Sequence, residues 1–156
     1  MSVAWPIFLA LLWLEQSPPA APADAVDKAF GLSGGSWTCT SFHGEQKIVS
    51  FEFSDPNAIV ESRAAPDGED DAAYERRFAF DADKGTWLLS WPSGGWSLTA
   101  QPWTHARWTF EGIVKAQRVR VTFTSFGQPA FRRDVETYSA GRWIERNGET
   151  CKRLSQ

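Results

Sequence analysis

The sequence predicts an all-β fold, a single antiparallel up-and-down β-barrel of about ten strands preceded by a short helix. Three observations lead to this prediction. Short segments rich in valine, isoleucine, threonine and aromatic residues recur along the chain, turn residues separate them, and apolar and polar residues alternate within several of them. The chain has 156 residues, which suits one domain with a sizeable core.

Residues 1–23 are predicted to be a signal peptide. The apolar run 3–14 is shorter than a membrane span, and Ala21-Pro22-Ala23 has small residues at the spacing that a signal peptidase reads. Cleavage after Ala23 leaves a barrel domain of residues 24–156 and removes Glu15, which changes the net charge from −3 to −2. An uncleaved anchor or a later start are the alternatives, because no Lys or Arg precedes the run.

The order of the elements follows from the turn residues. Residues 24–32 are expected to form the short helix, which leads to Gly34-Gly35. Most later connections have hairpin length, so strands that follow one another in sequence should pair antiparallel. The predicted strands are 36–42, 46–53, 58–63, 73–80, 86–91, 96–100, 106–112, 117–126, 130–139 and 142–154.

Alternation indicates that each strand buries one face. In 117–126, Val119, Val121 and Phe123 alternate with polar residues. A sheet that closes on itself buries such faces and leaves no open edge.

The conformation of Asn147-Gly148 decides how the barrel closes. As a bulge, this pair keeps ten strands and the first strand can pair antiparallel with the last. As a hairpin, it gives eleven strands and a parallel closure.

Composition excludes several functions. The chain is 42% hydrophobic and slightly acidic, which disfavours disorder and binding to nucleic acid or an anionic membrane. The common nucleophile, nucleotide and metalloprotease motifs are absent, so neither a cofactor nor a metal is predicted. The histidines, His43 and His105, are too few for a metal site. The acidic run 64–73 lacks the EF-hand pattern and is interpreted as a solvated loop.

The aromatic residues are the most suggestive feature, because five of nine tryptophans lie within residues 87–108. Trp87 and Trp91 share one face of a strand, and Trp108 and Phe110 share one face of another. They are predicted to line a cavity for an apolar or amphipathic ligand. The alternative is that they fill the barrel interior.

Arg133 belongs to the same question. If Phe131 and Val135 face the interior, Arg133 does too, and a buried arginine needs an anion. A ligand carboxylate is one candidate, which makes Arg133 the predicted polar anchor. A structural ion pair with Glu145 or Glu52 is the other.

The two cysteines connect the ends of the fold. Cys39 and Cys151 are an even pair, which in an oxidising compartment is more often bonded than free. If they lie opposite each other on antiparallel first and last strands, residue 37 lies opposite residue 153. Trp37 would then contact Arg153 as a structural cation–π pair. This register fails if Asn147-Gly148 forms a hairpin.

Four segments carry a resemblance to a known family. "GGSWTC", "FAFDADKGTW", "GGWSLTAQPW" and "ETCKR" occur in this order, and residues 30–154 resemble the calycin superfamily of lipocalin-like barrels, in particular a family of exported bacterial lipocalin-like proteins. The resemblance implies a Trp–Arg contact at the closed end of the barrel. The Arg-x-Tyr pair typical of fatty-acid-binding barrels is missing.

The leading functional prediction is a periplasmic or secreted barrel that binds a small apolar or amphipathic molecule non-covalently. After signal cleavage, no integral membrane association is expected. A small enzyme of the cyclase or isomerase type is an alternative, for which Tyr74, Tyr138 and Glu145 are the loose acid and base candidates. A structural or interaction protein with a solid core is the third.

Overall fold

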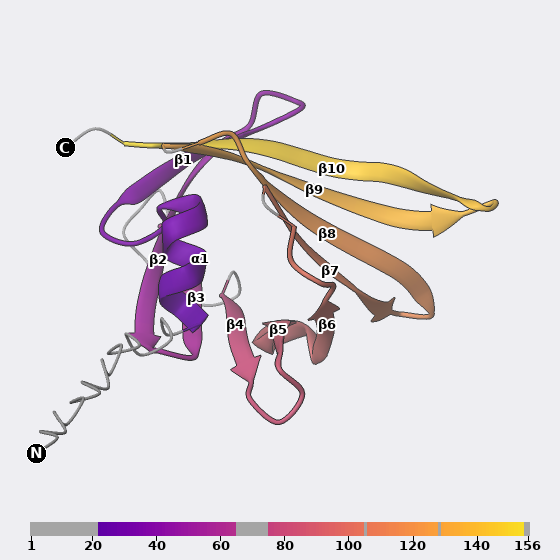
Figure 1. Ribbon diagram of the computed structural model, residues 1–156. Helices are drawn as coiled ribbons and strands as arrows, with labels where there is room; N and C mark the ends of the chain where they lie inside the picture. The colour runs from indigo at the N-terminus through magenta and orange to yellow at the C-terminus, as the bar shows by residue number, and fades with distance from the viewer. Residues whose placement is uncertain (1–21, 65–74, 105, 128, 155–156) are drawn as a thin grey trace, which may run out of the picture.

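The computed structural model describes residues 22–64, 75–104, 106–127 and 129–154 and forms a closed antiparallel barrel (Figure 1). The strands follow one another around the barrel in sequence order, and β1 pairs with β10 to close it. The elements are α1 (Pro22–Phe30), β1 (Ser36–Ser41), β2 (Gln46–Asp55), β3 (Ala58–Arg63), β4 (Arg76–Asp81), β5 (Thr86–Trp91), a 3-10 turn (Pro92–Gly94), β6 (Trp96–Ala100), β7 (Arg107–Val114), β8 (Gln117–Ser125), β9 (Ala130–Ser139) and β10 (Arg142–Arg153). The predicted fold class is confirmed.

The seam between β1 and β10 has the register that the cysteines predict. Cys39 pairs with Cys151 and forms a disulfide with it, and Trp37 pairs with Arg153. The Arg153 guanidinium lies 6.0 Å from the centroid of the Trp37 ring. Figure 1 shows the end of β10 running alongside β1. Antiparallel closure is possible because β10 continues through Asn147-Gly148, with its register shifting by a bulge between Glu145 and Asn147.

The two glycines before β1 make room for this contact. Gly34 has a left-handed φ of 72°, which favours glycine. A Cβ on Gly35 would lie 2.9 Å from Nε of Arg153. The guanidinium of Arg153 also donates a hydrogen bond to the carbonyl oxygen of Ser33. The sequence "GGSW" therefore lets the last strand's arginine lie close to the backbone that leads into the first strand.

The helix α1 lies across one end of the barrel. Ala23, Val26 and Phe30 form its buried stripe. The Ala23 amide donates to the Pro56 carbonyl oxygen in the β2–β3 turn, and the Ser125 hydroxyl at the end of β8 donates to the Ala29 carbonyl oxygen. These contacts attach both ends of the helix to the barrel.

The helix begins and ends two residues earlier than the predicted 24–32. It ends because Gly31 has a φ of 63°, and because the Asp27 carboxylate accepts hydrogen bonds from the amide and hydroxyl of Ser33. The predicted cleavage after Ala23 falls in the first turn of α1, and residues 1–21 lie outside the described part of the chain. No helix of the described residues is long and apolar enough to span a membrane.

Candidate functional site: an aromatic cavity and a buried ion network

The barrel interior has an aromatic half next to α1 and a charged half beyond it. Near α1, the centroid of the Phe30 ring lies 6.2 Å from that of Trp108 and 6.5 Å from that of Phe131. On each of five strands, a buried apolar residue near α1 is followed, two residues farther from the helix, by a charged residue on the same face of the strand. The pairs are Val49 and Lys47, Ile59 and Glu61, Phe78 and Arg76, Phe131 and Arg133, and Cys151 and Glu149. Because successive side chains of a strand point to opposite faces of the sheet, all five charged side chains lie on the barrel interior.

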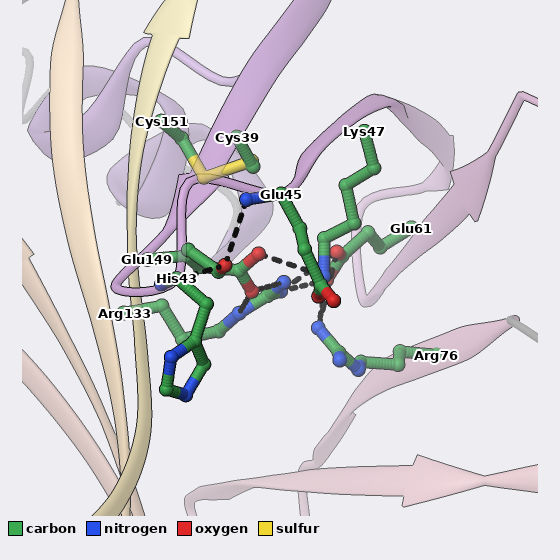
Figure 2. Close-up of polar contacts among 10 residues, drawn as sticks. Cys39, His43, Glu45, Lys47, Glu61, Arg76, Arg133, Glu149 and Cys151 are labelled. Atoms are coloured by element: carbon green, nitrogen blue, oxygen red, sulfur yellow. Dashed lines mark hydrogen bonds and ion pairs between the residues drawn. A yellow bond between two sulfur atoms is a disulfide. The ribbon is translucent and has the colours of Figure 1, made fainter.

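These five residues form an ion network that crosses the barrel (Figure 2). The Arg133 Nη1 lies 2.7 Å from both carboxylate oxygens of Glu61, on the far side of the barrel. Its Nε donates to Glu149 at 2.6 Å, and its Nη2 also contacts Glu149. Arg76 adds a bond to Glu61 at 3.1 Å, and Lys47 adds one to Glu149 at 2.7 Å.

The network keeps both carboxyl groups ionised. Burial alone would raise the pKa of Glu61, but the charges of Arg133 and Arg76 outweigh it and lower the pKa to about 2. Burial likewise opposes ionisation of Glu149, while Arg133 and Lys47 lower its pKa below the ordinary value. Arg133 and Glu61 are at most 1% exposed, so these charges interact with little screening by water.

The free energy of unfolding should therefore fall as the solution is acidified. A lowered folded pKa means that ionised Glu61 stabilises the fold fully above its ordinary pKa of 4.5, and that this stabilisation is lost as the pH falls through about 2. The loss from this group should be on the order of 3 kcal/mol. Urea unfolding between pH 5 and pH 2 measures it. The variant Glu61→Gln should flatten this part of the profile, whereas Glu136→Gln on the outer face should not.

A cavity of about 640 Å³ lies under α1, between the helix and strands β4 to β7. Its wall is mainly apolar and aromatic, and none of the described residues that line it carries a charge. The lining residues are Pro22, Ala25, Val26, Phe80, Gly85, Thr86, Trp87, Ala100, Gln101, Pro102, Trp103 and Trp108. This volume is within the range that small-molecule sites occupy.

Three indole rings meet at this cavity. The centroid of Trp108 lies 5.6 Å from that of Trp87 and 5.7 Å from that of Trp103. Trp108 is buried, whereas Trp103 is 42% exposed, and Gln101 and Pro102 beside it are exposed. The cavity therefore runs from a buried indole to the protein surface beside α1.

The buried indole carries an unused hydrogen-bond donor. Among the described residues, the Nε1 of Trp108 has no acceptor, and the same is true of Trp37, which does not line the cavity. An indole N–H donates and cannot accept, and a buried donor without an acceptor is costly.

The predicted ligand-binding residues lie in different parts of the interior. Trp87 and Trp108 line the cavity. Phe110 is buried in the core, with its ring centroid 4.7 Å from that of Trp108. Trp91 stacks on Trp96 at 3.9 Å and lies under the Arg76 guanidinium. None of Phe110, Trp91 and Arg133 is among the residues that line the cavity.

The expected ion-pair partners of Arg133 are wrong. Glu145 lies on the outer face, where it pairs with Arg132 at 2.7 Å, and Glu52 is exposed on β2. The alternation of side chains along a strand explains the error. Glu61 lies on the same inward face as Ile59, and Glu149 lies on the same inward face as Cys151. The same alternation, applied to every strand, places the other four charged side chains inside, but it does not say which of them pair. Sequence reasoning also missed Trp103 and the covering role of α1, since neither follows from alternation.

The other chemical candidates within the described residues do not gather into one site. Tyr138 and Glu145 are exposed, and neither is among the residues that line the cavity. Tyr74, His105 and all but Ala64 of the acidic run lie outside the described residues. His43 is exposed in the β1–β2 turn. Within the described ranges, no group of three or more His, Cys, Asp or Glu residues could hold a metal ion.

Comparisons with known proteins include a structural likeness. No family model matches the chain, and no curated protein matches it. Among solved structures, the chain is similar to EF1p2_mFAP2b bound to DFHBI, with 12% sequence identity and a TM-score of 0.38. The match covers 82% of this chain and 98% of that chain.

Proposed function

We propose that this protein is an exported barrel that holds a small apolar molecule non-covalently in the cavity under α1. The observation that carries the proposal is the cavity itself, which reaches the surface, contains three tryptophans and has no charged lining residue. Burying apolar ligand surface against these rings contributes roughly 25 cal/mol per Å², before ordering costs. Trp87, Trp103 and Trp108 are the proposed ligand contacts.

The ion network has a structural role in this proposal. Arg133 binds two buried carboxylates and does not line the cavity, so it is not proposed as the ligand's anchor. The ten-strand closure and the Trp37–Arg153 contact support the calycin resemblance.

Export is supported by the apolar run 3–14 and by the disulfide, since disulfides persist in oxidising compartments. We propose a periplasmic or secreted location, with a mature chain that begins at Asp24. N-terminal sequencing of the exported protein tests this, and a retained Met1 would contradict it.

Filling the cavity should weaken binding of a neutral apolar dye. Nile red should bind the native protein saturably and shift its emission to shorter wavelength. Ala25 is exposed on α1 and lines the cavity, so Ala25→Trp should occupy the space without disturbing the core and weaken binding at least about tenfold. Lys28→Trp, an exposed position of α1 outside the lining, is the matched control and should bind normally. Absence of binding to the native protein would contradict the proposal.

A further inference from the structure

We propose that the protein docks on an anionic lipid membrane through the tips of two neighbouring hairpins, β7–β8 and β9–β10, at the end of the barrel away from α1. This surface, the tip patch, shares no residue with the lining of the cavity. Its charge, its exposed apolar and aromatic side chains and the backbone of its first turn carry the proposal. The tip patch consists of Ile113, Lys115, Arg118, Tyr138, Arg142 and Trp143.

The two hairpin tips form one continuous surface, because β8 pairs with β9. Each hairpin ends in a turn of two residues, which are 115–116 and 140–141. The Arg118 guanidinium joins them, since it lies 4.8 Å from the ring centroid of Tyr138 and 5.4 Å from that of Trp143. Figure 1 shows β8, β9 and β10 reaching farther from α1 than the other strands. The tip patch is therefore presented at a projecting end of the molecule.

The tip patch is a positive surface on a negative protein. Residues 112–119 and 137–144 carry no Asp or Glu and have three exposed basic residues, Lys115, Arg118 and Arg142. These segments carry a charge of +3, so the rest of the chain carries −6 of the total of −3. Arg118 also pairs with Glu111, but at 3.8 Å and partly exposed this contact is weak. The net charge alone disfavours an anionic membrane, whereas this uneven distribution turns one end of the barrel toward it.

Exposed apolar and aromatic side chains lie among these charges. Ile113 is 68% exposed and Tyr138 is 37% exposed, and the ring centroid of Trp143 lies 5.3 Å from that of Tyr138. Tryptophan and tyrosine are enriched where a membrane meets water, and basic side chains bind anionic headgroups. A soluble polyanion would attract the basic residues but would not bury Ile113. The combination therefore favours a lipid surface as the partner.

The turn between β7 and β8 holds a lysine in a strained backbone conformation. Lys115 and Ala116 have φ values of 49° and 64°, in the left-handed region where two-residue hairpin turns usually have Asn or Gly. A side chain with a β-carbon is disfavoured there, and such strain is typical of positions that are used. Asn-Gly would form this turn without strain, but it would not place a positive charge at the tip.

Co-sedimentation of the protein with lipid vesicles tests the proposal. We expect the protein to bind vesicles that contain phosphatidylglycerol, and to bind vesicles of phosphatidylcholine alone at least about tenfold more weakly. Added salt should weaken the binding. Lys115→Glu/Arg142→Glu should weaken it at least about tenfold, because two attractive charges become repulsive. Ile113→Ser should weaken it at least about threefold, since less apolar surface then leaves water.

Charge reversal at the other end of the barrel is the matched control. Lys28 on α1 and Lys84 in the β4–β5 turn are exposed, so Lys28→Glu/Lys84→Glu makes the same change in net charge outside the tip patch. This variant should bind the phosphatidylglycerol vesicles at least about tenfold more tightly than the tip variant. Both double variants should bind Nile red as the native protein does, which shows that the barrel and its cavity are intact.

Three results would overturn the proposal. The first is no binding of the native protein to phosphatidylglycerol vesicles, which leaves the proposed function standing if Nile red still binds. The second is an equal loss of vesicle binding in the two double variants, because the attraction would then depend on overall charge alone. The third is binding to heparin without binding to vesicles, which would make the partner a soluble polyanion.

Discussion

Replacing Arg133 with methionine should lower the free energy of unfolding by about 3–5 kcal/mol at pH 7. The substitution leaves the Glu61 carboxylate fully buried, and removes from Glu149 a partner that contacts it through two nitrogens. Arg76 stays on Glu61 and Lys47 stays on Glu149, but both carboxylates lose their fully buried hydrogen-bond donor, and a buried carboxylate with too few donors is costly. Urea unfolding followed by tryptophan fluorescence measures the change.

Two comparisons make this result specific. Arg120→Met removes an outer pair with Glu136 that is partly exposed, so it should cost no more than about 1 kcal/mol. Arg133→Lys keeps a positive charge between the two carboxylates, so it should lose less stability than Arg133→Met. If Arg133→Met costs no more than Arg120→Met, the ion network does not hold the barrel together.

Removing the disulfide should have an effect of similar size. Cys39 and Cys151 are separated by 112 residues in sequence, and a cross-link that closes so long a loop stabilises by about 4 kcal/mol in the chain-entropy model. The double variant Cys39→Ala/Cys151→Ala should lose stability of this order. Urea unfolding under non-reducing conditions compares it with the native chain.

The chemistry of the bond supplies the control. Unfolding of the native protein in dithiothreitol should show the same loss as the double variant, and dithiothreitol should leave the double variant unchanged. Non-reducing peptide mapping should recover the linked peptides of β1 and β10. Equal stability of the native and double-variant proteins would mean that the seam is held by its strand pairing and by Trp37 and Arg153.

Much of the barrel could be predicted because alternation and turns are local signals. The period of two identified the inward faces, and the even cysteine pair set the register of the seam. The sequence alone does not distinguish a bulge in β10 from a hairpin, because Asn147-Gly148 is equally a hairpin sequence. The structure decides it through pairing: β10 keeps β9 as its neighbour on both sides of the bulge.

The candidate site was harder to predict because its contacts are not local. Parity placed Arg133 inside, but its partner Glu61 is 72 residues away in sequence and lies across the barrel. The covering of the cavity by α1 depends on contacts of the helix with the β2–β3 turn and with the end of β8, which no sequence period encodes. The division of the interior into an aromatic half and a charged half follows from these long-range contacts.

The most direct test of ligand binding under α1 is a proton–nitrogen correlation spectrum of the tryptophan indole groups during titration with Nile red. We expect the Trp87, Trp103 and Trp108 resonances to shift, because these three rings line the cavity. The Trp37 resonance should stay in place, because Trp37 does not line the cavity. A spectrum in which the Trp108, Trp87 and Trp103 resonances do not move at saturating ligand would contradict the account.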